Sequence, residues 1–156
     1  MADLLSALAG VPNPRQPFPN LATAGQPGSA HFEALKAAGT EVVIDIRDPM
    51  EPRPLDEPGT VRRLGMEYVN VPVLQGMLDD AMMDRALGEL RRNAGRPTLL
   101  HCASANRVGG VLIPWFILDH GMSEDEAVET AMKIGLRGPD LLEWGLDYAR
   151  RKKEGS

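Results

Sequence analysis

The sequence has a single cysteine and no long hydrophobic run. Among its 156 residues Cys102 has no partner for an intrachain disulfide. A thiol that stays reduced suits a reducing compartment, so we expect the protein in the cytoplasm. No stretch of about 18 apolar residues occurs, which predicts no membrane-spanning helix and no membrane partner. The first nine residues also lack the basic segment that begins a signal peptide.

An excess of positive charge is also missing. The chain has 17 basic and 22 acidic residues and a net charge of −5, so nucleic acid is not an expected partner. Three histidines and one cysteine, scattered along the chain, lack the spacing of a metal site, and we expect no metal and no other cofactor. The length predicts one domain over 1–156, with an N-terminal arm over 1–19 and a core over 20–152.

Short apolar runs alternate with stretches that have helical spacing. This alternation predicts an α/β fold in three layers, with a mostly parallel sheet of four or five strands and helices on both faces. The segment 47–59 carries four prolines and is expected to be a loop. The expected strands are 21–24, 41–46, 67–73 and 98–101, and the expected helices are 3–9, 29–38, 61–64, 80–93, 108–120, 123–134 and 139–152.

The stretch 98–113 holds the cysteine between a short apolar run and a longer one. A strand, a tight loop and a helix are expected there. Backbone amides of such a loop and the free amides of the helix start form an anion site. The same donors favour the thiolate form of Cys102, and Arg107 offers an oxyanion two parallel hydrogen bonds. We therefore predict that Cys102 is a nucleophile and that Arg107 binds the anion, with a buried, inert cysteine as the alternative.

The other residues of this loop have expected supporting roles. We expect His101 to orient the loop through a hydrogen bond and to favour the thiolate, with a purely structural histidine as the alternative. Ser104 and Asn106 are suited to hydrogen bonds with loop backbone. If the loop forces Ala105 to a positive φ, this alanine strains the loop by about 1–2 kcal/mol. The predicted anion-binding loop consists of His101, Ala103, Ser104, Ala105, Asn106 and Val108.

The segment His101-Cys-Ala-Ser-Ala-Asn-Arg107 resembles the His-Cys-loop-Arg signature of cysteine-dependent protein phosphatases. In those enzymes the cysteine forms a phosphocysteine intermediate and the arginine binds phosphate. This chain has four residues between cysteine and arginine instead of the usual five, and the shorter loop is similar to that of rhodanese-type sulfurtransferases. Segments 22–27, 42–47, 68–72 and 121–127 also resemble, in order, a bacterial phosphatase-like family named after a beta-lactamase-hydrolase-like protein. The resemblance covers residues 18 to 138.

The resemblance implies a hydrolase of phosphate monoesters, acting on a phosphoprotein or on a phosphorylated small molecule. In such families an aspartate soon after the preceding strand is the general acid. Asp79 and Asp80 are the candidates here, although capping of a helix is the first expectation for them. Arg47, Asp48 and Gln26 follow other strands and are expected at the pocket rim, with ordinary loop roles as the alternative.

Two other functions stay open. The four-residue spacing allows a persulfide carrier that acts on a sulfur-containing small molecule, because relatives of this phosphatase-like domain occur fused to persulfide-oxidising enzymes. A non-catalytic anion-binding domain is the other alternative. Ala105 stands where related loops have glycine, and Val108 stands where related phosphatases have serine or threonine.

Overall fold

The structure, a computed structural model, describes residues 3–155. Its centre is a five-stranded sheet in the order β1-β2-β5-β3-β4, in which β1 is antiparallel to β2 and the other pairs are parallel. The predicted α/β class and strand number are therefore confirmed. The strands are β1 (Arg15–Phe18), β2 (Leu21–Ala24), β3 (Val42–Asp45), β4 (Glu67–Asn70) and β5 (Thr98–His101).

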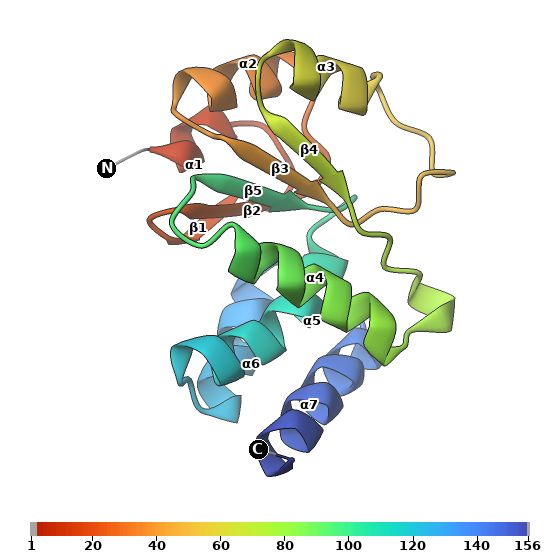
Figure 1. The fold of residues 1–156 in the computed structure, drawn as a ribbon. Helices are drawn as coiled ribbons and strands as arrows, with labels where there is room; N and C mark the ends of the chain where they lie inside the picture. The colour runs from red at the N-terminus through yellow and green to blue at the C-terminus, as the bar shows by residue number, and fades with distance from the viewer. Residues whose placement is uncertain (1–2, 156) are drawn as a thin grey trace.

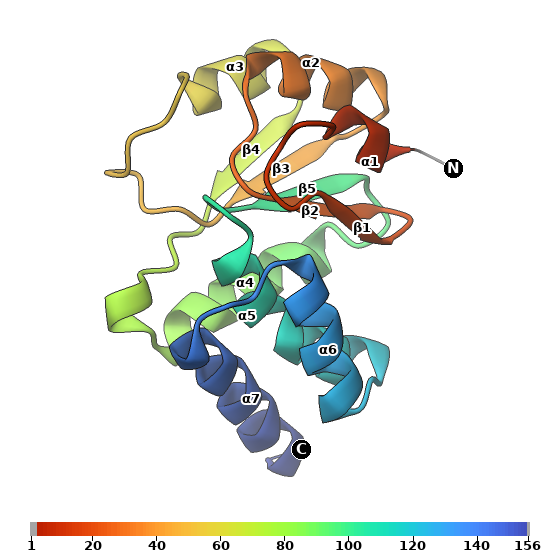
Figure 2. The ribbon, with the colours of Figure 1, turned by 180° about the vertical axis from the view of Figure 1, so that it is seen from behind.

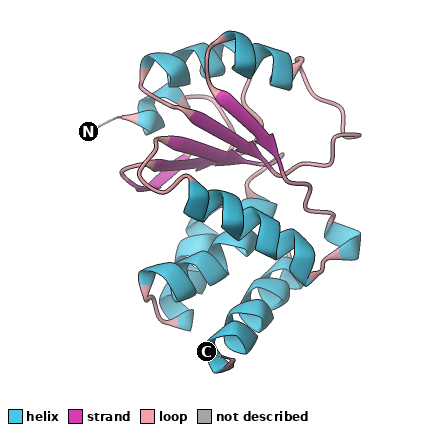
Figure 3. Cartoon of the chain, in the orientation of Figure 1, coloured by secondary structure: helices cyan, strands magenta, loops and turns pink. Residues whose placement is uncertain are grey.

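Helices cover both faces of the sheet (Figures 1 and 3). One face carries α1 (Leu4–Ala7), α2 (Ser29–Ala37) and α3 (Glu57–Arg63). The other face carries α4 (Asp80–Arg92), α5 (Asn106–Pro114), α6 (Glu124–Ile134) and α7 (Pro139–Glu154). A short 3₁₀ turn, η1 (Gln75–Met77), precedes α4, and a π-helical turn, η2 (Trp115–Asp119), follows α5.

Alternate residues of the central strands face the two helical layers. On β3 the side chain of Val43 joins the core under α2, whereas Ile44 joins the core under α5. On β5 Leu99 and Leu100 divide in the same way. Since both faces of these strands are buried, their sequences are continuous apolar runs, as is usual for parallel sheets.

Two predicted boundaries are wrong. The expected N-terminal arm contains β1, which adds an antiparallel edge strand to the sheet (Figure 2). Helix α3 begins at Glu57, inside the expected loop, because Asp56 caps it and Pro58 lies in its first turn, where a missing amide hydrogen costs nothing. Helix α2 begins at Ser29, the first residue of the expected helix, and the amide of Gly28, its N-cap residue, donates to His31 Nδ1.

The helix expected over 108–120 changes form at its proline. Pro114 has no amide hydrogen to continue the ladder, and the chain passes there from α5 into the π-helical turn η2. The helix expected over 123–134 is α6, and a capping box of Ser123 and Glu126 begins it. None of the helices within residues 3–155 combines the length and the apolar character needed to cross a membrane.

Candidate active site

The carboxyl ends of three parallel strands bring the predicted site residues together. In the sheet register His101 of β5 lies opposite Ala24 of β2 and Asp45 of β3. The segments that follow these strands therefore start at one edge of the sheet. They carry Cys102, Gln26 and Arg47 respectively.

The loop after β5 wraps its own cysteine. Cys102 is 1% exposed, and the amide of Ala105 donates to its Sγ at 3.1 Å. Ala105 has a φ of +73°, the left-handed conformation that strains an alanine, and it is the N-cap residue of α5. The amides of Asn106, Arg107 and Val108 lie in the first turn of α5, where they have no acceptor within the helix. These amides and the positive end of the helix dipole provide the donors of an anion site.

The strained alanine is matched by a glycine on another segment. Ala105 is fully buried, and a Cβ added to Gly135 would lie only 3.0 Å from its methyl group. Gly135 itself has a φ of +143°. The Ala105 methyl group therefore occupies space that a side chain at residue 135 would need.

Polar groups from two other segments fix the loop. Asn106 Oδ1 accepts the amides of Arg137 at 2.7 Å and Gly138 at 3.0 Å. Asn13 Nδ2 donates to the carbonyl oxygen of Ser104 at 2.8 Å. Asn106 thus bonds to backbone amides as expected, and these belong to the segment between α6 and α7. Ser104 takes part through its backbone oxygen, and within residues 3–155 its side chain makes no hydrogen bond of the expected kind.

Gly25 allows the turn after β2 to approach the cysteine loop. A Cβ at residue 25 would lie 2.4 Å from the carbonyl oxygen of Ala103 and 3.0 Å from Pro12 Cβ. We expect Gly25→Ala to lower the free energy of unfolding by about 2 kcal/mol. Gly88→Ala is the matched control: its Cβ meets nothing within 4 Å, and in α4 it should add up to about 1 kcal/mol. Urea unfolding measures both, and a Gly25→Ala protein as stable as the parent would show that the two segments are not in close contact.

Arg107 is held by a carboxylate and keeps one edge free. Its side chain is 11% exposed, and Nη1 lies 3.0 Å from Glu51 Oε1 and 3.3 Å from Oε2. Within residues 3–155 no acceptor bonds to Nε or Nη2 of Arg107. This edge of a guanidinium can give two parallel hydrogen bonds to an oxyanion.

Glu51 connects two arginines and was not foreseen from the sequence. It lies on the segment between β3 and α3, which extends beyond the strand ends (Figure 2), and it also accepts from Arg47 Nε at 3.0 Å. Burial alone would raise the pKa of Glu51, but the hydrogen bonds and charges of Arg47 and Arg107 lower it below 4.5. The stabilisation from this carboxylate is therefore present above pH 4.5 and is lost as the pH falls through the lowered pKa.

The predicted rim residues divide into two that join the site and one that does not. Arg47 is 8% exposed and donates from Nη1 to Gln26 Oε1 at 2.7 Å. The backbone amide of Gln26 in turn donates to the backbone carbonyl oxygen of Ala103. Asp48 Oδ1 accepts the amide of Met50 at 2.9 Å, which is a local turn, so the ordinary loop role holds for Asp48.

A buried polar cluster, also missed from the sequence, lies next to Cys102. His101 Nδ1 lies 3.2 Å from the Cys102 carbonyl oxygen, and His101 Nε2 lies 2.6 Å from Glu57 Oε2. Asp45 Oδ2 accepts from Arg53 Nη2 and from the Tyr68 hydroxyl, each at 2.6 Å. Burial and the bond to Asp45 raise the pKa of Tyr68, so it stays a neutral donor. The expected hydrogen bond from His101 to the loop is the one to the Cys102 carbonyl oxygen.

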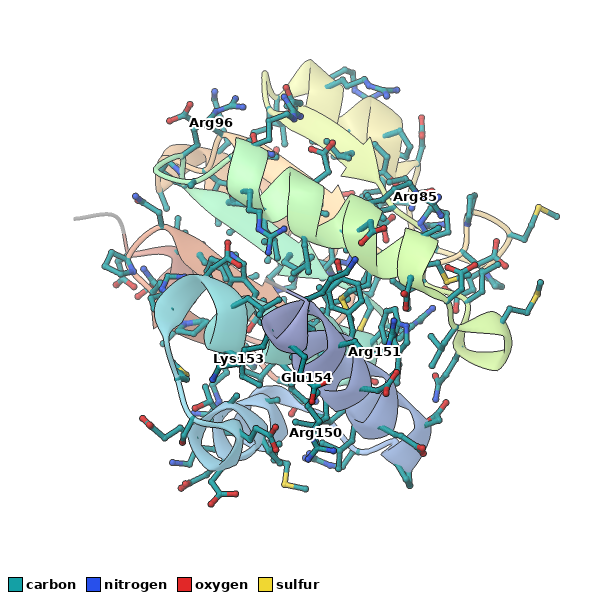
Figure 4. All side chains as sticks on the ribbon, turned by 60° about the horizontal axis from the view of Figure 1, so that its bottom comes forward. Arg85, Arg96, Arg150, Arg151, Lys153 and Glu154 are labelled. Carbon is teal, nitrogen blue, oxygen red and sulfur yellow. The ribbon has the colours of Figure 1, made fainter. Side chains whose placement is uncertain are left out.

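The two candidate general acids make other contacts. Asp79 Oδ1 accepts the amide of Met82 at 2.8 Å, so Asp79 caps α4 as first expected. Asp80 forms a bidentate pair with Arg151 of α7, labelled in Figure 4. Neither carboxylate contacts the cysteine loop in the part of the chain described. Their catalytic role stays a prediction.

Comparison with known proteins supplies structural relatives. No family model matches the sequence, and no curated protein matches it either. A protein of Shewanella putrefaciens CN-32 described as a phosphatase candidate (DUF442) superposes with a TM-score of 0.79 at 21% identity, over 94% of this chain and 97% of the other. TpbA of P. aeruginosa gives 0.70 at 20% identity, over 89% and 84%.

The catalytic core of the PP-IP phosphatase SIW14 from S. cerevisiae gives a TM-score of 0.74 at 14% identity, over 93% of both chains. These identities are low, and what the three proteins share with this chain is the arrangement of the whole domain. The chain therefore has the fold of the protein tyrosine phosphatase-like phosphatases, as the resemblance of its Cys102–Arg107 loop implied.

Proposed function

We propose that the protein is a cysteine-dependent phosphatase that hydrolyses phosphate monoesters. One observation carries the proposal: a single loop unites a sulfur that accepts an amide hydrogen bond, the free amides of a helix start, and an arginine with an unpaired edge. A phosphate dianion matches these donors in charge and in number of acceptors. The substrate we propose is a phosphoprotein or a phosphorylated small molecule.

The reaction proceeds in two displacements on phosphorus. The Cys102 thiolate attacks the phosphorus atom, a sulfur–phosphorus bond forms, and the bond to the ester oxygen breaks. The ester oxygen leaves with the electron pair and takes a proton. Water then attacks the phosphocysteine, releases orthophosphate and restores the thiolate. In both steps Arg107 and the amides of the α5 start hold the charge on the phosphoryl oxygens.

Protonation of the leaving oxygen limits the range of good substrates. The Asp79 carboxylate caps α4 and the Asp80 carboxylate pairs with Arg151 of α7, so neither is assigned to this proton transfer. An aryl ester, whose leaving group is a weak base, needs less help than an alkyl ester. We therefore expect p-nitrophenyl phosphate to be turned over faster than glycerol phosphate. A loss of this turnover in Asp79→Ala or Asp80→Ala would instead identify the acid.

Glu51 places a negative charge beside the proposed anion site. Its carboxylate bonds to Nη1 of Arg107, and a bound dianion would use the other edge. Two anions near one guanidinium repel, by about 1 kcal/mol at this degree of exposure. Glu51→Gln should therefore lower the inhibition constant of orthophosphate about fivefold.

Steady-state inhibition of p-nitrophenyl phosphate turnover measures this constant. Glu41→Gln is the matched control, because Glu41 is exposed and its contact with Arg96 is long, at 3.4 Å. Weaker inhibition in Glu51→Gln would contradict the repulsion and show that Glu51 holds Arg107 in its binding position.

The four-residue spacing supports a second candidate function, a persulfide carrier. In that case the Cys102 thiolate attacks the outer sulfur of thiosulfate, the sulfur–sulfur bond of thiosulfate breaks, and sulfite leaves with the electron pair. Cys102 then carries one added sulfur atom, which intact-mass measurement detects. The structural relatives described above are phosphatases, which favours phosphoryl transfer. If the protein binds orthophosphate but hydrolyses no ester, the result would favour the third function, a non-catalytic anion-binding domain.

A further inference from the structure

Four ionisable side chains next to Cys102 form a closed group, named here the Glu57 cluster: Asp45, Arg53, Glu57 and His101. Asp45, Glu57 and His101 are fully buried, and the Arg53 side chain is 10% exposed. Two carboxylates and one guanidinium leave one negative charge uncompensated if His101 is neutral, and none if it is protonated. An unbalanced buried charge is costly, so the composition of the cluster favours an imidazolium.

The hydrogen bonds of His101 lead to the same conclusion. Nε2 faces the Glu57 carboxylate at 2.6 Å, and Nδ1 faces the carbonyl oxygen of Cys102 at 3.2 Å. A carbonyl oxygen and an ionised carboxylate only accept, whereas a neutral imidazole carries a single N–H. Both bonds can form together only with a doubly protonated ring.

A proton on Glu57 instead of His101 would also balance the charge. Two contacts favour the ionised carboxylate. Gln26 Nε2 donates to Glu57 Oε1 at 2.7 Å, and Arg53 Nε lies 3.8 Å from the same oxygen. Arg53 also pairs with Asp45 through Nη2, but its Nε is buried without a hydrogen-bond partner within the described residues, so this edge of the guanidinium places positive charge beside Glu57. Both contacts stabilise the anion and place the proton on His101.

The cluster is a poor metal site although its geometry is compact. Asp45, Glu57 and His101 each offer a ligand atom, all within 4.8 Å of one another. However, Asp45 Oδ1 already accepts the amide of Arg47, and Asp45 Oδ2 accepts from Arg53 and Tyr68. A divalent cation would have to displace a buried guanidinium. The arrangement holds a proton instead.

We propose that Glu57 is a positioning residue for Cys102: it keeps His101 protonated, and the imidazolium, bonded to the Cys102 carbonyl, supports the thiolate. The inference rests on the proposed role of Cys102 as a nucleophile. Glu57 bonds neither to the sulfur nor to Arg107 or the first-turn amides of α5; apart from Gln26 at the rim, it reaches the cysteine loop through His101. Glu57 is the first residue of α3. The start of this helix therefore places a carboxylate beside His101, at the end of β5, although the two residues are far apart in the sequence.

The pH dependence follows from the charges around His101. Burial lowers its pKa, but the hydrogen bond and charge of Glu57 and the charge of Asp45 outweigh burial and raise the pKa above 6.5. Arg53 and Tyr68 face the same carboxylates, and the ring of Phe32 packs edge-on against the imidazole. A raised folded-state pKa contributes stability that is fully present below pH 6.5 and lost as the pH rises through the raised value. Support for the thiolate should fade over the same range.

The test measures the charge of the only cysteine directly. Ultraviolet absorbance of the thiolate is followed against pH, with Cys102→Ser as the blank, in the parent protein, Glu57→Gln, His101→Gln and the double variant. We expect Glu57→Gln to raise the midpoint of the titration by about one pH unit. His101→Gln should give a similar rise, and the double variant should show no further rise, because both changes interrupt one path. Glu41→Gln should leave the midpoint unchanged.

Two results would overturn the proposal. One is a folded Glu57→Gln protein with the parent midpoint, and the other is a double variant whose shift is the sum of the single shifts. If Glu57→Gln does not fold, nitrogen NMR of His101 in the parent decides: an imidazolium at pH 7 supports the proposal, and a neutral ring refutes it. Neither readout uses phosphatase turnover, so a chain without turnover can still pass or fail this test.

Discussion

Cys102→Ser should lose turnover of p-nitrophenyl phosphate by on the order of 10⁴-fold or more, the scale found when a nucleophile is removed. Serine is nearly isosteric with cysteine, but its hydroxyl does not ionise near neutral pH. The amide of Ala105 can still donate to the new oxygen, as it does to Sγ. We therefore expect the fold and the anion site to persist while the chemistry stops.

Binding of orthophosphate separates this result from a folding defect. Arg107 and the first-turn amides of α5 are untouched by Cys102→Ser, so the dissociation constant, measured by calorimetry, should change by less than about threefold. Glu41→Gln, at an exposed position remote from the cysteine loop, should keep full turnover. Turnover by Cys102→Ser at the rate of the parent would exclude a reaction through the sulfur.

Arg107→Lys should lower kcat/KM by roughly 10²–10³-fold, although it keeps the positive charge. Lysine offers a point charge, and it cannot give two parallel hydrogen bonds to a phosphoryl group. The free Nε and Nη2 edge of Arg107 is the feature that lysine lacks. Stability should change little, because the pair with Glu51 is partly exposed and such pairs contribute at most about 1 kcal/mol.

Arg91→Lys is the matched control for the same chemical change. Arg91 forms a bidentate pair with Asp119 on an exposed part of α4, so the substitution should leave kcat/KM unaltered. Steady-state kinetics and thermal unfolding of both variants provide the measurements. An Arg107→Lys protein within a few-fold of the parent would show that the free edge of the guanidinium does not contact the transferred group.

The sequence was sufficient where one local property decides the structure. Buried parallel strands need apolar residues on both faces, and β2, β3 and β5 follow that pattern closely. The loop from Cys102 to Arg107 was recognisable because the residue types that bind an anion are adjacent in the chain. Asn106 and Asp79 also have the structural roles expected of short polar side chains.

The rest depends on contacts between distant segments. Glu51 and Glu57 lie in a proline-rich stretch that resembles a solvated loop, and only the folded chain brings them to Arg107 and His101. The close approach of Gly135 to the Ala105 methyl group also brings together residues from separate segments of the chain. The proline content also hid the start of α3, since Pro58 is compatible with a first helical turn. No periodicity encodes such pairings.

Trapping the phosphorylated enzyme tests the central claim most directly. The parent protein is mixed with p-nitrophenyl phosphate, quenched in acid during turnover and digested, and the peptide containing residue 102 is weighed by mass spectrometry. The proposed reaction predicts one added phosphoryl group on Cys102 and none in the Cys102→Ser protein. Turnover at full rate with an unmodified Cys102 peptide, or with the phosphoryl group on another residue, would contradict it.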